Sequence, residues 1–305
     1  MHTVVMLHDV VFTQALTKHF GSVAALDGFN LRVERGEVHG FLGPNGAGKS
    51  TTLRILLGML KPDSGTAEIL GVDAWSADPT LRRRVAYVPG DVSVWPNLTG
   101  GETIDLLLRM RGIDPLRSNR DALVERFDFD PCRKGRTYSR GNRQKIALIA
   151  ALAAPVELLL FDEPTAGLDP LMELEFTTCV HEAVEQGATV LLSSHILSEV
   201  ERLADQVTII RQGRAVESGR LESLRRLRKT RVRIEYVGEL SQVMGLADVD
   251  VIDSVESQSS TQVTLLVGSD GMDALLKTLV DVRVVALTSE APSLEELFMD
   301  AYRSR

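Results

Sequence analysis

The 305-residue chain is 44% hydrophobic and 25% charged, which is the composition of a soluble globular protein with about two domains. Its 42 acidic residues outnumber its 34 basic residues, and the net charge of −8 argues against a general nucleic-acid-binding protein. The two cysteines, Cys132 and Cys179, lack metal-ligand spacing, so a reducing compartment is the simplest interpretation.

The N-terminal residues and the apolar tracts predict a chain that stays in the cytosol. Residues 1–6 lack the charged leader and the long apolar core of a signal peptide. The most apolar tract, residues 146–161, is interrupted by Pro155 and Glu157 and is shorter than the roughly 20 residues that a membrane-spanning helix needs. Any membrane-embedded part is therefore expected to belong to another chain.

A glycine-rich loop is the most informative motif. Residues 31–42 predict two strands separated by Arg35-Gly36, and residues 43–50 then match the phosphate-binding pattern G-x-x-x-x-G-K-[ST]. Glycines let backbone N–H groups close around a polyphosphate, and the start of the next helix adds unpaired donors. We expect Lys49 at the β- and γ-phosphates and Ser50 on the bridging Mg²⁺. The predicted nucleotide-binding residues here are Gly43, Pro44, Asn45, Gly46, Ala47, Gly48, Lys49, Ser50 and Thr51.

A helix is predicted to run from the loop to about Leu60, where the turn at residues 62–65 ends it. Residues 79–143 are then rich in arginine and show helical spacing, for example at Ile104, Leu107 and Leu108. They predict an inserted helical subdomain of about residues 79–155.

A Ser-x-Gly turn, Ser139-Arg140-Gly141, precedes the helix-like residues 146–154 and is a second phosphate-binding device. One molecule has no obvious need of two such devices for one nucleotide. The turn is therefore expected to cap a nucleotide that a second molecule holds.

Two buried strands are predicted to end at one edge of a parallel sheet. Residues 157–161 lead into Asp162 and Glu163, and residues 188–193 lead into Ser194 and His195. We expect Asp162 to hold Mg²⁺, Glu163 to polarise the attacking water, and His195 to orient that water or bond the γ-phosphate. A strand ending in solvated acids and a structural histidine are the alternatives. The other five histidines are interpreted as structural.

The last third of the chain predicts a hairpin and then a domain boundary. Residues 207–210 and 215–217 flank the turn at residues 211–214. The chain is basic from residue 220 to 233 and acidic beyond it, which predicts domains of residues 1–220 and 221–305. The second is expected to be a small α+β domain that begins near residue 231, and the basic run at 225–233 is either a solvated helix and linker or a contact for headgroups or a partner. Its predicted strands are 232–237, 263–267 and 282–287, and its helices 272–280 and 294–302.

Together the motifs resemble, in kind and order, those of the nucleotide-binding subunit of an ABC transporter. Residues 43–50 match the Walker A motif, and residues 158–163 match Walker B with its catalytic glutamate. Residues 139–142 resemble the signature motif, which more often reads S-G-G-Q, and residues 166–169 match the D-loop. His195 matches the switch histidine. The resemblance covers about residues 5–220.

The resemblance implies an α/β fold of the P-loop NTPase type, with a mixed sheet core and an inserted helical subdomain. It implies ATP hydrolysis with ATP and Mg²⁺, and two chains that close head-to-tail with Ser139 and Gly141 at the partner's γ-phosphate. It adds Phe20, where the family stacks an aromatic ring on adenine, and Asp169 of the D-loop as nucleotide-site residues. It also implies a separate membrane permease and a cytoplasmic, peripheral position on the inner face of the cell membrane; no nucleic-acid partner is expected.

The variant turn at residues 138–142, the Pro44-Asn45 pair and the C-terminal residues 292–298 are similar to drug-resistance exporters of the daunorubicin/doxorubicin type. This implies export of drugs or other amphipathic compounds, with a regulatory or dimer-stabilising C-terminal domain. In this family the permease contacts the cargo, so the sequence of this chain does not identify the transported compound.

One position departs from the family. The family usually has Gln after Tyr-Val-Pro, where it meets Mg²⁺ or the attacking water and senses the permease, whereas this chain has Gly90 followed by Asp91. Glycine supplies no amide group. Either coupling or hydrolysis is altered, or Asp91 takes over through water, and both alternatives stay open.

Two other function classes compete with a transport ATPase. Non-transport relatives that act on ribosomes or DNA usually carry two nucleotide domains or long coiled coils, whereas this chain has one phosphate loop and no heptad tract between its Walker motifs. A regulatory module that binds ATP without hydrolysing it is kept open by Gly90. The presence of Glu163 and His195 argues against it.

Overall fold

The structure is a computed structural model that describes residues 9–226, 229–238, 245–257, 260–268, 270–290 and 295. The chain forms two compact units, Met1–Gly219 and Arg220–Arg305. The predicted helix at residues 294–302 and most of the C-terminal motif at 292–298 lie outside the described residues. Within the described residues, no helix is long and apolar enough to cross a membrane.

The central sheet of the first unit has the order β10-β9-β3-β8-β7-β6, and its strands from β9 to β6 run parallel. Three neighbouring strands, β3, β8 and β7, are buried along their whole length, as their apolar runs predicted. The predicted hairpin is also confirmed, because Gln212 and Gly213 both adopt the positive φ of a tight hairpin turn. The strands are β3 Val38–Leu42, β6 Val85–Val88, β7 Leu158–Asp162, β8 Thr189–Ser194, β9 Gln206–Arg211 and β10 Arg214–Arg220.

A second sheet of the first unit has the order β2-β1-β4-β5, in which β1 pairs antiparallel with both β2 and β4. The predicted strand pair at residues 31–42 is thereby split, since β2 and β3 belong to different sheets. One core cluster unites both sheets with helix α1, and it includes Leu16, Phe29, Phe41 and Leu53. The elements are β1 Asp9–Phe20, β2 Val23–Glu34, β4 Ser64–Ile69, β5 Val72–Asp73 and α1 Lys49–Leu56.

Helix α1 is shorter than predicted. It ends at Leu56 rather than near Leu60, because Gly58 adopts a φ of 65°, a left-handed conformation that ends helices. The helical segment expected at 79–155 also contains β6, which pairs with β7 and so belongs to the central sheet. The short apolar run at residues 85–88 carried no period long enough to reveal this strand.

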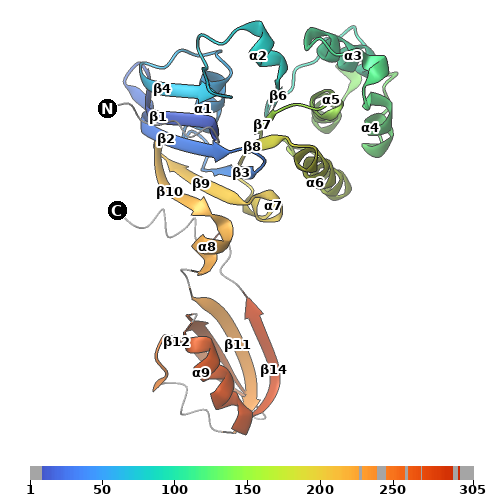
Figure 1. The fold of residues 1–305 in the computed structure, drawn as a ribbon. Helices are drawn as coiled ribbons and strands as arrows, with labels where there is room; N and C mark the ends of the chain where they lie inside the picture. Colours follow the sequence, from blue (N-terminus) through green and yellow to red (C-terminus); the bar gives the residue numbers. More distant parts are fainter. Residues whose placement is uncertain are drawn as a thin grey trace. The chain divides into compact units, whose positions relative to one another are not determined.

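Helices cover the central sheet, and α3, α4 and α5 form a group at one side of it, away from α1 (Figure 1). Helix α3 begins with a capping box, in which Thr99 and Glu102 each accept a backbone N–H of the other. The helices are α2 Pro79–Arg83, α3 Gly100–Met110, α4 Arg120–Arg126, α5 Arg140–Leu152, α6 Pro170–Glu185 and α7 Leu197–Leu203.

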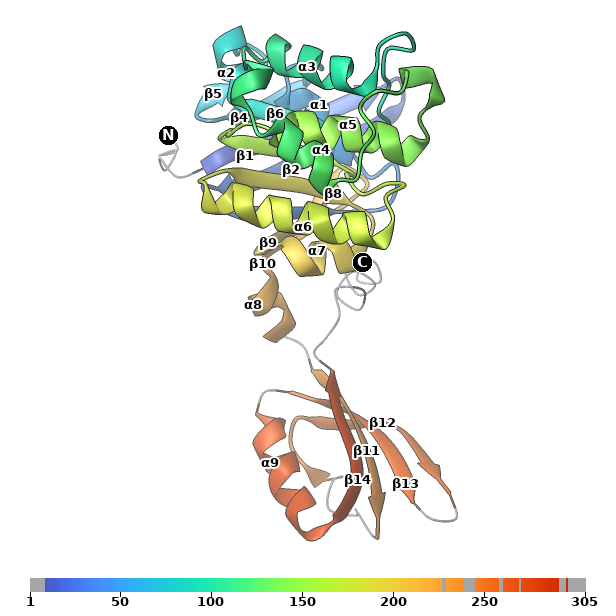
Figure 2. The same cartoon turned by 90° about the vertical axis from the view of Figure 1, so that its right-hand side faces the viewer.

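The second unit is a small α+β fold (Figure 2). Its antiparallel sheet has the order β12-β13-β11-β14, and its core joins sheet residues such as Ile234 and Leu265 to Leu275 of α9. The three predicted strands and the helix at 272–280 are confirmed. Strand β12 was missed because Asp250, Asp253 and Ser254 interrupt its apolar pattern. The elements are α8 Leu221–Arg226, β11 Thr230–Val237, β12 Val249–Glu256, β13 Thr261–Val267, α9 Gly271–Thr278 and β14 Arg283–Glu290.

Candidate functional site

The glycine-rich loop joins β3 to α1 and has a backbone that only glycine accommodates at its last turn. Gly48 adopts a φ of 117°, and a Cβ atom there would lie 2.7 Å from the carbonyl oxygen of Ala25. The loop is braced by the hairpin turn, because Gly213 N donates to Ala47 O at 2.9 Å. No side chain caps the start of α1, so its first N–H groups point toward the loop as donors for an anion.

Lys49 is the first residue of α1, and its side chain folds back onto the loop. Its side chain is almost buried, with 5% exposed, and its Nζ donates to Gly43 O at 2.6 Å and Pro44 O at 3.2 Å. Burial lowers the pKa of the ammonium, and the charges of Glu163 and Asp162 oppose that lowering. The loop and the two acids therefore share one electrostatic site. Ser50 and Thr51 are half-buried in the first turn of α1.

The two acids follow each other at the end of β7. Asp162 is 6% exposed and stands opposite Ser193 of β8, whose Oγ donates to Asp162 Oδ1 at 2.7 Å. Glu163 adopts a φ of 51°, a left-handed conformation that is uncommon for a residue with a side chain and that recurs at functional sites. Its N–H donates to Ser193 O at 2.8 Å, which fixes the turn.

His195 follows β8 and meets Glu163 at the same sheet edge. The His195 Nδ1 lies 3.0 Å from Glu163 Oε1, and the imidazole is half-exposed. The structure thus brings together Lys49, Asp162, Glu163 and His195 from three segments of the chain. The sequence did not single out Ser193, whose one signal was a polar residue in a buried strand beside an acid-ending strand.

The predicted second phosphate turn lies at the start of α5. Ser139 caps this helix, and its Oγ accepts the Asn142 N–H at 3.3 Å. Gly141 packs so closely on the loop after Glu163 that a Cβ atom would lie 2.2 Å from Gly167 O. The turn therefore contacts residues 164–169 of its own chain, while α5 lies with α3 and α4 rather than with α1 (Figure 1).

Position 90 lies directly against the acid pair. A Cβ atom on Gly90 would be 3.0 Å from Asp162 O and 3.7 Å from the Cβ of Glu163. The carbonyl of Gly90 accepts from Arg140 Nη2 at 3.5 Å, and the next residue, Asp91, is exposed. Position 90 thus adjoins Asp162 and Glu163, although no side chain extends from it here.

Phe20 and Asp169 make contacts of other kinds. Phe20 ends β1 with 51% of its surface exposed, and the Lys18 ammonium lies 5.9 Å from its ring centre. The carboxylate of Asp169 caps α6 by accepting the N–H groups of Leu171 and Met172, each at 3.1 Å. Asp169 therefore has a structural role in its own chain, whatever its role toward nucleotide.

The donor set fits a magnesium ion that nucleotide helps to hold. The described residues contain no cluster of three or more His, Cys, Asp or Glu side chains that forms a metal site by itself. Magnesium ordinarily takes one or two protein oxygens and completes its shell with phosphate oxygens and water. Asp162, whose charge acts on Lys49 of the loop, and Ser50 in the adjoining helical turn supply such oxygens.

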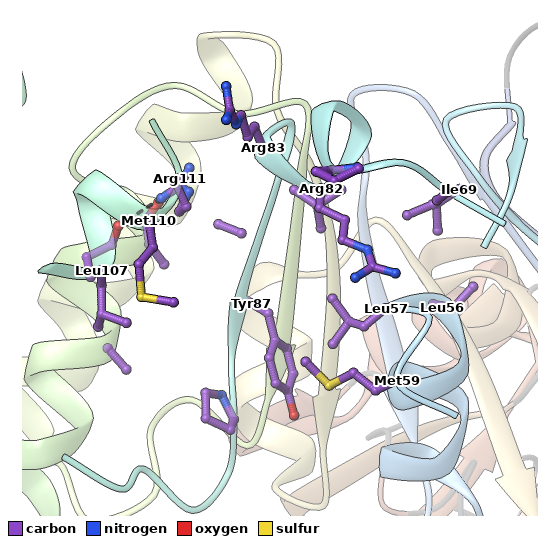
Figure 3. A pocket seen from close by; sticks show the side chains of 18 of the residues that line it. Leu56, Leu57, Met59, Ile69, Arg82, Arg83, Tyr87, Leu107, Met110 and Arg111 are labelled. Carbon is purple, nitrogen blue, oxygen red and sulfur yellow. Dashed lines mark hydrogen bonds between the residues drawn. The ribbon is translucent and has the colours of Figure 1, made fainter. Parts of the chain in front are cut away.

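An apolar groove of about 560 Å³ opens between α1, β6, α3 and α5 (Figure 3). Leu57, Met59, Leu107 and Met110 line it, together with Tyr87. Burial, and secondarily the charge of Asp162, raises the pKa of Tyr87 to about 12. Tyr87 belongs to β6, which pairs with β7, so the groove adjoins the strand that ends in Asp162.

Arg111 is the unusual polar residue of this groove. Its Nη1 donates to the carbonyls of Ala150 and Ala151 at 2.8 and 3.3 Å. Its Nε and Nη2 are buried, and neither has a hydrogen-bond partner among the described residues. Burial lowers the pKa of the guanidinium. The sequence did not reveal this groove.

A phosphate loop, an acid pair and a histidine on adjacent parallel strands define a P-loop nucleotide hydrolase. The family model described as "ABC transporter" matches residues 26–166, and one described as "AAA domain, putative AbiEii toxin, Type IV TA system" matches residues 133–201. The chain is 39% identical to the daunorubicin/doxorubicin resistance ATP-binding protein DrrA of Streptomyces peucetius, over 68% of this chain and 64% of that protein.

Other relatives match along nearly their whole length. The daunorubicin resistance ATP-binding protein DrrA3 of Streptomyces coeruleorubidus is 33% identical over 96% of each chain. The bacitracin transport ATP-binding protein BcrA of Bacillus licheniformis is 31% identical over 96% of this chain and 97% of that protein. A solved ATP-binding subunit of an ABC transporter superposes with a TM-score of 0.67 at 30% identity, covering 72% of this chain and 92% of that one.

The chain therefore belongs to the ABC transporter family, as an ATP-binding subunit whose activity is ATP hydrolysis coupled to transport. The fold class and the family that the sequence predicted are both confirmed. The roles of the individual site residues stay predictions.

Proposed function

We propose that this chain hydrolyses Mg²⁺-ATP at the edge formed by β3, β7 and β8 and thereby drives a separate membrane permease that exports amphipathic compounds. The observation that carries the proposal is the 3.0 Å contact between His195 Nδ1 and Glu163 Oε1, beside Lys49 and Asp162. It combines a base, a histidine and a phosphate-binding cation in one site.

Each side chain has a distinct role in this proposal. The Glu163 carboxylate takes a proton from water as the water oxygen attacks the γ-phosphorus, and the bond to the β,γ-bridging oxygen breaks to leave ADP. Its contact with His195 holds both side chains in place. As an imidazolium, His195 would donate from Nδ1 to the carboxylate and from Nε2 to the γ-phosphate. Lys49 exchanges its loop carbonyls for β- and γ-phosphate oxygens.

Magnesium would be held by Ser50 and Asp162. When bound, it neutralises charge on the β- and γ-phosphates. The hydroxyl of Ser193 leaves Asp162 Oδ2 for the metal, because it already donates to Oδ1.

We propose further that two chains bind two ATP molecules head-to-tail, each site joining residues 43–51 of one chain to Ser139 and Gly141 of its partner. In support, the turn at 139–142 begins α5, which lies with α3 and α4 and apart from α1 (Figure 1). Phe20 would stack on adenine, and Asp169 would lie at the same interface.

Mixing two inactive variants tests this composite site. Lys49→Ala and Ser139→Arg chains are each expected to lack turnover alone, and their mixture to regain it, because a heterodimer carries one site free of both substitutions. Phosphate release from the mixture and from each variant alone is the measurement. A mixture no more active than the sum of its parts contradicts the head-to-tail dimer.

Asp91 is proposed to serve, through water, the role of the missing glutamine. Its neighbour Gly90 lies against Asp162, and this adjacency supports a water bridge from the Asp91 carboxylate. Asp91→Ala is then expected to lower turnover by about 10-fold and to raise the Mg²⁺ concentration needed for half the maximal rate. Unchanged turnover and unchanged Mg²⁺ dependence contradict the proposal.

The groove of Figure 3 is proposed as the seat of the permease. Its walls are apolar, and the charged residues that line it are Arg82, Arg83 and Arg111, with no acid among the described lining residues. This lining suits an apolar helix that carries an acidic side chain, whose carboxylate would accept from the exposed guanidinium groups of Arg82 and Arg83. Strand β6, which carries Tyr87 and pairs with β7, would couple this docking to Asp162 and Glu163.

The cargo class rests on the named relatives, which are described by daunorubicin resistance and bacitracin transport. Through the permease, the chain would lie on the inner face of the cell membrane. The test uses inside-out vesicles that contain this chain and its permease. ATP-dependent uptake of doxorubicin that Lys49→Ala abolishes supports the proposal, and uptake of no amphipathic drug contradicts the assigned cargo class.

A further inference from the structure

Behind the Glu163–His195 pair lies a carboxyl group that the hydrolysis scheme does not use. Glu199, in the first turn of α7, is 3% exposed, and its Oε2 accepts from Ser194 Oγ at 2.6 Å. Ser194 is buried and directly precedes His195. A buried carboxyl with so short a bond to the residue beside the catalytic histidine calls for an explanation.

The Ser194 hydroxyl holds the backbone on both sides of His195. Ser194 precedes His195, and its hydroxyl oxygen accepts the N–H of Ile196, the residue after His195, at 2.9 Å. Its proton has two acceptors, Glu199 Oε2 at 2.6 Å and Ile196 O at 3.4 Å, and the shorter contact sets its direction. Glu199 thereby fixes the orientation of the Ser194 hydroxyl, which links the residues on either side of His195.

Glu199 is also close to the loop that follows Glu163. Burial raises the pKa of Glu199, whereas the hydroxyls of Ser194 and then of the buried Thr165 lower it. Glu173 of α6 raises the pKa further, and Arg202 of α7 lowers it. Oε1 makes no hydrogen bond of normal geometry within the described residues. Arg202 Nη2 lies 3.6 Å from Glu173 Oε2, so these two charges offset each other.

We propose that Glu199 is a positioning residue for ATP hydrolysis: as the acceptor for Ser194 Oγ, it sets the backbone that places His195 3.0 Å from Glu163. The proposal rests on the proposed roles of Glu163 and His195. It assigns Glu199 no contact with nucleotide, so it should influence turnover and not ATP binding.

Two substitutions that keep a side chain of similar volume distinguish the role of Glu199 as a hydrogen-bond acceptor from its role in packing. Glu199→Gln keeps a side-chain oxygen for Ser194 Oγ, whereas Glu199→Met keeps the volume and removes the acceptor. The full chain with Glu199→Met is expected to lose about 10- to 100-fold in kcat, with the KM for ATP unchanged, because a small misplacement of a catalytic group costs this much. Glu199→Gln is expected to stay within about threefold of the unsubstituted chain.

The decisive measurement is kcat in the His195→Ala background. If Glu199 acts through His195, adding Glu199→Met to His195→Ala lowers kcat no further. An equal loss in both backgrounds, or an equal loss with Glu199→Gln and Glu199→Met, overturns the proposal.

Two controls keep these outcomes interpretable. Should Glu199→Met fail to fold or to bind ATP, Ser194→Ala removes the same bond at the cost of one atom and undergoes the same test. If Glu163→Gln leaves turnover unchanged, the proposed catalytic site fails, whereas a turnover that needs Glu163 but ignores both Glu199→Met and Ser194→Ala sinks only the role of Glu199.

Discussion

Glu163→Gln is expected to lower ATP turnover by about 10²- to 10⁴-fold, the usual contribution of a general base, while ATP binding persists. The amide keeps the size of the side chain and one acceptor oxygen, so the contact with His195 and the turn after β7 should survive. Only the capacity to take a proton from water is lost. Phosphate release under saturating ATP measures the first effect, and nucleotide binding at equilibrium measures the second.

Glu185→Gln is the matched control, because Glu185 is an exposed glutamate at the end of α6 and should tolerate the same change. The bound nucleotide should also remain ATP in the Glu163→Gln chain and turn into ADP in the control. Equal turnover by the two variants would show that Glu163 is not the base and would favour a module that binds ATP for regulation.

Lys49→Ala is expected to weaken ATP binding by about 10- to 100-fold, because charge-assisted hydrogen bonds to phosphate of about 1.5–3 kcal/mol are removed. The lysine donates to Gly43 O and Pro44 O, and water can take over both of these loop carbonyls. The variant should therefore fold normally. Titration with ATP, followed by thermal unfolding with and without nucleotide, measures both expectations.

Lys61→Ala supplies the comparison for this substitution, since Lys61 is exposed and its ammonium lies 5.8 Å from the ring of Trp75. Its ATP affinity should match that of the unsubstituted chain. A Lys49→Ala chain that binds ATP with full affinity would contradict the assignment of residues 43–51 as the phosphate site.

The grouping of Lys49, Asp162, Glu163 and His195 was predictable because its signals are local in sequence. The order of residues 43–50 predicts the phosphate loop by itself. Two apolar runs predict neighbouring strands, one ending in Asp162-Glu163 and the other in Ser194-His195. Parallel pairing of β7 with β8 then brings the ends together, as expected.

What the sequence missed depends on tertiary register or on burial. Ser193 matters because it lies opposite Asp162 on the neighbouring strand. In the sequence Glu199 looks like an ordinary acidic residue on the surface of a helix, and only the packing of α7 buries it. Arg111 looks like one surface arginine among many, yet its guanidinium is buried beside the groove, against the carbonyls of Ala150 and Ala151. Strand β6 was not predicted because four residues inside a stretch of helical spacing are too few to show a periodic hydrophobic pattern.

Asp169 shows how one residue can satisfy two interpretations. An Asp before Pro170 is a strong local signal for the start of a helix, and its carboxylate does cap α6. Its proposed contact with nucleotide rests on family resemblance, because the structure contains one chain and this contact would form between two.

The most direct test of an ATPase that drives a membrane permease is a native pull-down from detergent-solubilised cells, with ATP present. Glu163→Gln serves as the bait that binds ATP without turnover, and Lys49→Ala as the control that does not bind it. Recovery of one polytopic membrane protein with Glu163→Gln, and its loss with Lys49→Ala, is the predicted result. Recovery of ribosomes or nucleic acid, or of no membrane protein at all, would contradict it.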